Sequence, residues 1–83
     1  MQFAYENANA REVFIAASFN DWNPKANPLS KASDGRWTAE LLLKPGFYEY
    51  RLVVDGAWIE DPKSVDYVPN PFGGVNSAIT VGT

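Results

Sequence analysis

Short segments in which apolar and polar residues alternate recur along the whole chain, separated by turn residues. They are rich in β-branched and aromatic side chains, and no window of helical length has apolar residues at the i, i+3, i+4 and i+7 spacing of an amphipathic helix. The pattern predicts strands at Gln2–Tyr5, Glu12–Ser18, Arg36–Leu43, Phe47–Val54, Ala57–Glu60 and Ser77–Val81. We expect an all-β fold, an antiparallel β-sandwich of the immunoglobulin-like kind, although periodicity alone also fits a closed barrel.

Glycine and proline mark the reversals between these strands. Ser33–Gly35 and Lys44–Gly46 are typical turns, and Asp55 with Gly56 between two apolar runs is a strong hairpin signal. Consecutive strands are therefore expected to be antiparallel neighbours. Two longer segments, Phe19–Ala32 and Asp61–Asn76, hold five of the six prolines. Because proline cannot donate to a sheet ladder, we expect both segments to be surface loops.

Alternation along two strands separates core from exterior. Trp37 shares a face with Ala39, Leu41 and Leu43, so it is expected in the core. The segment Phe47–Val54 points four side chains inward, namely Tyr48, Tyr50, Leu52 and Val54, and four outward, namely Phe47, Glu49, Arg51 and Val53.

The turn at Asp55 and Gly56 fixes where the next tryptophan points. Closing this hairpin pairs Val53 with Trp58, and residues directly opposite each other in an antiparallel pair project to the same face. Trp58 is therefore expected on the outward face with Arg51, unless a bulge intervenes.

Two tryptophans are left without a core role. Trp22 lies in the polar stretch "SFNDWNP", and Trp58 faces outward beside Arg51. A pyranose ring offers an apolar face and a rim of hydroxyls, so aromatic planes combined with Arg and Asn donors suit a sugar. The structural alternative is that Trp22 folds back as a lid on the sandwich and Trp58 packs under a loop.

Composition and charge exclude several other function classes. The formal net charge is −3 and the seven Lys and Arg residues are scattered, which argues against nucleic acid as a partner. The absence of Cys and His removes disulfides, thiolate metal sites and the commonest general base, so we expect no metal and no cofactor. The apolar runs are too short to span a bilayer, so no membrane association is expected. If Met1 is the true start, the lack of a signal-peptide pattern predicts a cytoplasmic protein.

Four motifs occur in an order that resembles a known family. They are "FIAASFNDWNP", "DGRW", "GFYEYRLVVDGAWIEDP" and "NPFGGVNSAITV", and together they cover about Glu12 to Val81. The order resembles carbohydrate-binding module family 48, which includes the glycogen-binding domain of AMP-activated protein kinase beta subunits and the N-terminal domain of isoamylases and branching enzymes. The resemblance implies an early-set immunoglobulin-like sandwich that binds α-1,4-linked glucans such as glycogen, starch and β-cyclodextrin.

The resemblance also implies a set of ligand contacts. The motif positions that bind sugar in the family fall on Trp22, Arg51, Trp58, Phe72 and Asn76. At three positions this chain departs from many glycogen-binding members, which have Lys in place of Arg51, Leu in place of Phe72, and Thr or Ser in place of Gly74. An Arg can donate a flatter, bidentate pattern than Lys, so the hydroxyls that are recognised are expected to differ.

The function expected from these observations is non-catalytic α-glucan binding by a single module over residues 1–83. The alternative is a structural or protein-interaction module of the same fold, packed against a kinase or amylolytic partner domain. An outward patch of Phe47, Val53, Trp58 and Phe72 would suit either function. A hydrolase would need two carboxylates facing one cleft, whereas the acidic residues lie mostly in turns, so we expect no enzyme activity. No calcium-loop spacing is present either.

Overall fold

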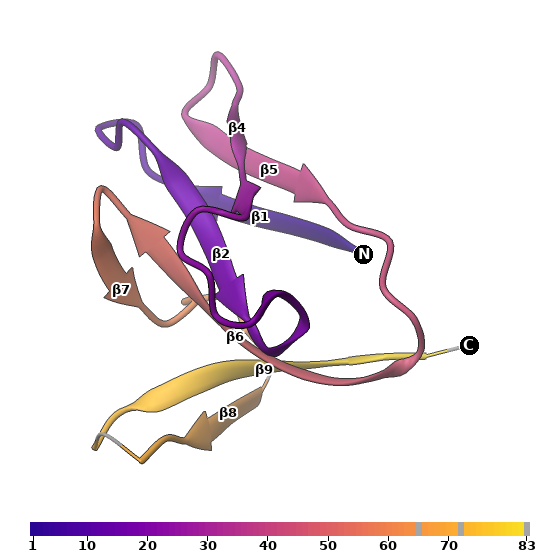
Figure 1. Ribbon diagram of the computed structural model, residues 1–83. Helices are drawn as coiled ribbons and strands as arrows, with labels where there is room; N and C mark the ends of the chain where they lie inside the picture. The colour runs from indigo at the N-terminus through magenta and orange to yellow at the C-terminus, as the bar shows by residue number, and fades with distance from the viewer. Residues whose placement is uncertain (65, 72, 83) are drawn as a thin grey trace.

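The chain folds into two antiparallel sheets packed face to face (Figure 1). The computed structural model describes residues 1–64, 66–71 and 73–82. One sheet has the strand order β1-β5-β4, with β1 at Gln2–Glu6, β4 at Ser30–Lys31 and β5 at Arg36–Glu40.

The second sheet is larger. It has the order β3-β2-β6-β9-β8, and β7 also pairs with β6. Its strands are β2 at Val13–Ala17, β3 at Asn27–Pro28, β6 at Gly46–Val54, β7 at Ala57–Ile59, β8 at Asp66–Pro69 and β9 at Val75–Val81. The predicted all-β antiparallel sandwich is therefore confirmed.

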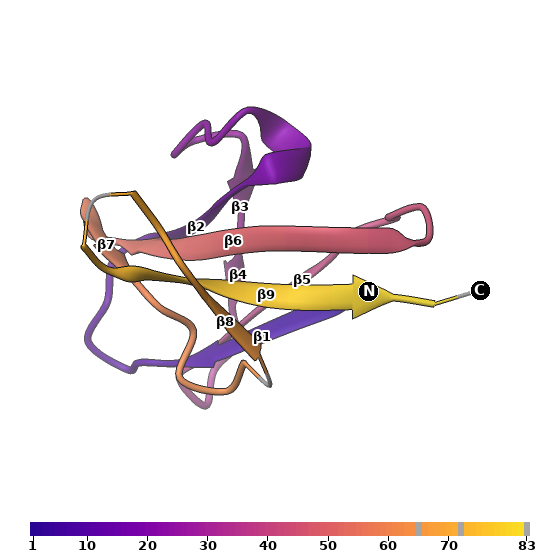
Figure 2. The same ribbon diagram turned by 90° about the horizontal axis from the view of Figure 1, so that it is seen from below.

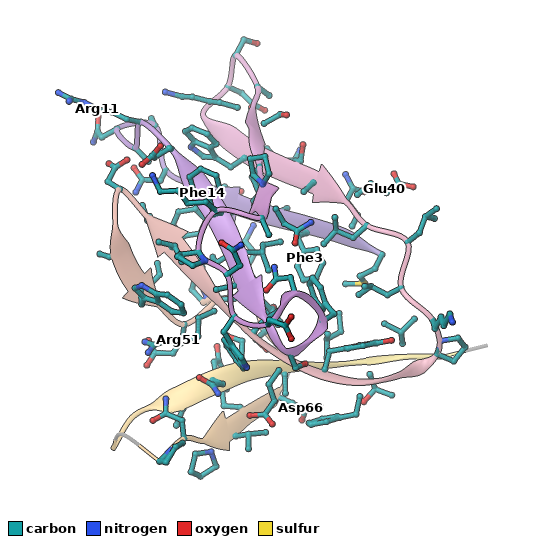
Figure 3. The ribbon with its side chains drawn as sticks, in the orientation of Figure 1. Phe3, Arg11, Phe14, Glu40, Arg51 and Asp66 are labelled. Carbon is teal, nitrogen blue, oxygen red and sulfur yellow. The ribbon has the colours of Figure 1, made fainter. Side chains whose placement is uncertain are left out.

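The core lies between the two sheets. Phe3 of β1 meets Tyr50 of β6 edge to face, with ring centroids 5.1 Å apart, and Ile15 and Leu52 are buried beside them. Figure 3 shows the Phe3 side chain in this inner space. Trp37 is buried as predicted, and its Nε1 donates a hydrogen bond of 2.9 Å to the carbonyl of residue 7.

The hairpin between β6 and β7 has the predicted register. Val54 pairs with Ala57 and Val53 pairs with Trp58. Asp55 and Gly56 have φ angles of 49° and 87°, the two positive values that a type I′ turn requires. Each of these turn residues therefore has a backbone role.

Asp55 also ties this turn to the start of β2. Its carboxylate accepts hydrogen bonds of 2.9 Å from the backbone N–H groups of Arg11 and Glu12. Hydrogen bonds from the Glu12 and Arg11 amides hold the pKa of this exposed carboxyl below its ordinary value.

The prediction for Arg36–Leu43 was wrong at its end. β5 stops at Glu40, and the residues through Lys44–Gly46 carry the chain from one sheet to the other instead of forming a hairpin. The expectation that consecutive strands are neighbours fails here, and also between β1 and β2, because a sandwich needs connections between its sheets. The predicted alternation nevertheless continues, since Leu41 and Leu43 pack against the core and Leu42 is 98% exposed.

The two proline-rich segments are not loops throughout. The first begins within a 3₁₀ turn, Ser18–Asn20, and continues through β3 and β4, and the second contains β8. All three strands lie at sheet edges, and Pro28 and Pro69 occupy edge strands, where the missing N–H costs no central ladder bond. Short edge strands of this kind carry too little alternation for a sequence pattern to reveal them.

The predicted outward patch of Phe47, Val53, Trp58 and Phe72 was wrong, as the position of Val53 shows. Its side chain is on the outward face but only 4% exposed, because Phe14 of β2 and Trp58 of β7 flank it across the sheet. Phe47 is 56% exposed, but it lies six residues before Val53 along β6, about 20 Å away. These residues do not form one patch, and Phe72 lies outside the described residues.

The two ends of the sandwich differ. The start of β1 and the end of β9 lie at one end, whereas β7 and the turn between β8 and β9 lie at the other (Figures 1 and 2). Across the described residues, the structure contains no helix long and apolar enough to cross a membrane.

Candidate functional site

A cleft of about 450 Å³ opens on the outward face of the larger sheet. The described residues that line it are Trp22, Arg51, Trp58, Asn70, Pro71 and Asn76. The structure thus brings together four of the five residues predicted as sugar contacts. The fifth, Phe72, lies outside the described residues. The volume is within the range of small-ligand sites, about 300 to 1,000 Å³.

Trp22 reaches the cleft from an unusual backbone conformation. The segment after β2 rises over the sheet face that is turned away from β1 (Figure 2). Asp21 and Trp22 both have φ angles of 57°, in the left-handed region that few residues other than glycine adopt. Backbone strain of this kind costs about 1–3 kcal/mol per residue and is concentrated at ligand sites.

Asn20 secures the strained segment. Its Oδ1 accepts from the Ala17 amide at 2.9 Å, and its Nδ2 donates to the Ile15 carbonyl at 2.9 Å and to Asn27 Oδ1 at 2.6 Å. The Trp22 amide adds a bond of 2.9 Å to the Ala17 carbonyl. Sequence reasoning did not single out Asn20, because an Asn in a turn-rich stretch has many alternative local roles.

Arg51 and Trp58 are joined across the β6–β7 hairpin. The Arg51 guanidinium donates through Nη2 to the Trp58 carbonyl at 3.2 Å, and the Trp58 side chain is 40% exposed. Figure 3 shows Arg51 extending outward from β6, away from Phe3. The Arg51 Nε is buried and has no hydrogen-bond partner among the described residues.

Asn76 forms the third polar part of the cleft. It is 9% exposed, its Nδ2 donates to Glu49 Oε1 at 3.2 Å, and its Oδ1 accepts from Asn70 Nδ2 at 3.3 Å. Asn70 and Pro71 were not predicted as site residues. In the sequence these two residues belong to a turn-like stretch, and the pairing of β8 with β9 brings Asn70 and Pro71 to the cleft.

The lining suits recognition of a neutral, hydroxylated ligand. Two indoles supply apolar faces, while Arg51 and the amides supply hydrogen-bonding groups. No carboxylate occurs among the described lining residues. Across the described part of the chain, no group of three acidic, His or Cys residues could hold a metal ion.

A second hollow, of about 310 Å³, opens by the inner face of the sandwich near the start of β1. The polar groups of Tyr50, Asp61 and Lys63 in its lining are hydrogen-bonded to one another. Tyr50 donates its hydroxyl proton to Asp61 Oδ2 at 2.6 Å, and Asp61 Oδ1 accepts from the Lys63 amide at 2.9 Å. Burial, followed by this bond to Asp61, raises the pKa of Tyr50 well above its ordinary value. We assign these groups a structural role.

The fold and the cleft together define the class. An antiparallel β-sandwich with an exposed cleft of aromatic, amide and guanidinium groups is typical of a carbohydrate-binding module. A family model described as the glycogen recognition site of AMP-activated protein kinase matches residues 1–83. The chain belongs to this family, which confirms the resemblance seen in its motifs, and its membership implies carbohydrate binding.

Individual relatives are subunits of that kinase. Over 71 residues the chain is 42% identical to 5'-AMP-activated protein kinase subunit beta-2 of Mus musculus and of Homo sapiens, with 86% of this chain and 25% of each relative covered. It is 38% identical over 71 residues to subunit beta-1 of Sus scrofa, covering 86% of this chain and 55% of that protein. The chain thus spans about a quarter of the length of the beta-2 relatives.

Proposed function

We propose that residues 1–83 form one non-catalytic module that binds α-1,4-linked glucans such as glycogen, starch and β-cyclodextrin. Trp22 and Trp58 stack on glucose rings, and Arg51 and Asn76 hydrogen-bond the hydroxyl rim. The observation that carries the proposal is the convergence of these four residues, from four separate segments, on one cleft. Phe72 is retained as a contact on the family resemblance alone.

The expected affinity follows from the stacking area. If about half of a tryptophan's ~200 Å² is covered, each indole contributes roughly 2.5 kcal/mol at ~25 cal/mol per Å² before the costs of association. Two indoles and a few hydrogen bonds suggest a free energy of about −4 to −8 kcal/mol, which corresponds to millimolar to micromolar binding. Polymeric glucans would gain further from repeated contacts.

The chemistry of the acidic residues supports a non-catalytic role. Asp34 and Asp55 accept hydrogen bonds from the backbone at turns, and Asp61 is buried against Tyr50. Glycoside hydrolysis needs two carboxylates on either side of the scissile bond. The described lining of the cleft offers neither.

A protein-interaction role is the second candidate function. Leu42, which is fully exposed, and the exposed Phe47 lie at the end of the sandwich away from β7. A partner bound to these two side chains would not cover the cleft. Relatives that are kinase subunits make a kinase or another catalytic domain a suitable partner. The two functions are compatible, because neither Leu42 nor Phe47 is among the described residues that line the cleft.

Titration with β-cyclodextrin or maltoheptaose tests the main proposal. The indole N–H signals of Trp22 and Trp58 should shift in NMR spectra, whereas that of Trp37, bonded inside the core, should stay nearly unchanged. An absence of any shift at millimolar sugar would contradict glucan binding and leave the interaction role. A shift of Trp37 alone would place the ligand outside this cleft.

A further inference from the structure

A chain of hydrogen bonds begins at Glu49, which shares the outward face of β6 with Arg51, and ends in the β8–β9 turn. Glu49 accepts from Asn76, Asn76 accepts from Asn70, and Asn70 accepts through Oδ1 from the Gly74 amide at 3.1 Å. The backbone N–H of Asn70 also donates to the backbone carbonyl of Gly74 at 2.9 Å, which closes the turn. Glu49 itself is not among the described residues that line the cleft.

The polarity of this chain is fixed at both ends. An ionised carboxylate can only accept hydrogen bonds, so it turns the Asn76 NH₂ group toward β6 and the Asn76 carbonyl toward Asn70. At the other end, the backbone N–H of Gly74 can only donate, which turns the Asn70 carbonyl toward it. Both amides can then adopt only one of their two flipped orientations.

We propose that Glu49 is a positioning residue for glucan recognition, acting through Asn76. It fixes which edge of the Asn76 amide points at the sugar, and it holds the turn that carries Pro71 against the cleft. The inference rests on the proposed glucan-binding function, because the positioned amide is one of its contacts. The neighbouring Arg51 directs its guanidinium to the Trp58 carbonyl, while Glu49 engages Asn76.

Two substitutions separate positioning from charge. Glu49→Gln keeps an acceptor at Oε1, so the chain retains its polarity and the dissociation constant for β-cyclodextrin should stay within about twofold of wild type. Glu49→Ala removes the acceptor, and we expect binding to weaken about three- to tenfold, the effect of one hydrogen bond. Equal losses in both variants would overturn the proposal, since they would show that the charge acts on the ligand directly.

A double-mutant cycle tests whether Glu49 acts through Asn76. In an Asn76→Ala background, Glu49→Ala should cause no further loss of affinity. A second, additive loss would contradict the proposal. The matched control is Glu40→Ala, which removes an exposed carboxylate from the other sheet and should leave affinity unchanged. Should Glu49→Ala fail to fold, Glu49→Met, which keeps the length of the side chain, replaces it.

A measurement without sugar separates this inference from the proposed function. The Asn76 side-chain NH₂ signals should be protected from hydrogen exchange in the wild type and in Glu49→Gln, and should lose protection in Glu49→Ala. Unchanged protection in Glu49→Ala would overturn the positioning role. A wild type with protected signals that does not bind β-cyclodextrin would instead refute the glucan-binding function and with it the role of Glu49 in recognition.

Discussion

Tyr50 and Arg51 are consecutive residues of β6 that serve opposite faces of the same sheet. The Tyr50 hydroxyl is bonded to Asp61 between the sheets, and the Arg51 guanidinium is bonded to the Trp58 carbonyl at the outward cleft. The pleat of one strand therefore supports the core and the candidate binding site within two residues. Stability and ligand binding should accordingly respond to different substitutions along β6.

Removing the Tyr50 hydroxyl should lower the stability of the fold without changing the affinity for the ligand. In Tyr50→Phe the buried Asp61 carboxylate loses a partner, and we expect the free energy of unfolding to fall by about 1–3 kcal/mol. Urea denaturation measures this change, and a β-cyclodextrin titration should give an unchanged dissociation constant. Tyr48→Phe is the matched control, because its hydroxyl bonds an exposed carbonyl at Lys44 and should matter less. Equal losses in the two variants would contradict the structural role of the Tyr50–Asp61 pair.

Removing the Trp58 indole should weaken glucan binding strongly while the domain stays folded. Trp58 is 40% exposed and covers Val53 on the outward face, outside the core between the sheets, so Trp58→Ala should leave the domain folded and weaken glucan binding at least tenfold. Co-sedimentation with glycogen measures the loss. In contrast, Trp37→Ala empties a core position and should destabilise the fold by about 3–5 kcal/mol. An unfolded Trp58→Ala variant would show that this indole is structural.

Substitutions at Trp22 should reveal the strain in its backbone. Trp22→Gly and Trp22→Ala both remove the indole, so both should lose glucan binding. Only glycine relieves the left-handed conformation, and we expect Trp22→Gly to be more stable than Trp22→Ala by about 1 kcal/mol. Thermal denaturation distinguishes the two variants. If alanine is tolerated as well as glycine, the segment carries no strain.

Asp55 should contribute to the acid sensitivity of the fold. Its pKa is lowered from an ordinary value of 3.8 by backbone hydrogen bonds, so its stabilising effect is present above that value and is lost as the pH falls through the lower folded-state pKa. Asn also tolerates the positive φ of the turn, so Asp55→Asn changes mainly the charge. Unfolding curves should be measured from about pH 2 to about pH 7, a range that includes the ordinary carboxyl pKa. The free energy of unfolding should fall less steeply with acidification in the variant than in the wild type. Parallel pH profiles for the two proteins would contradict this role.

Alternation and turn chemistry predicted the parts of the molecule that depend on local pairing. The register that placed Trp58 opposite Val53 followed from Asp55 and Gly56, and the outward position of Arg51 followed from the alternation along Phe47–Val54. The burial of Val53 and the edge strand β8 were not predictable in this way, because both depend on which strands become neighbours. The same holds for Asn70, whose contact with Asn76 arises from the pairing of β8 with β9. Local sequence thus predicted the aromatic and cationic residues that line the cleft, whereas the amide groups beside them depend on tertiary pairing.

The arrangement of the two ends of the sandwich has a practical consequence. The start of β1 and the end of β9 lie together, opposite β7 and the β8–β9 turn (Figure 1). A tag, a fluorophore or a solid support attached before β1 or after β9 would leave the indoles facing outward. Arrays of this module joined end to end, or displayed on a bead, would therefore present many clefts to one polysaccharide and convert weak single contacts into firm capture.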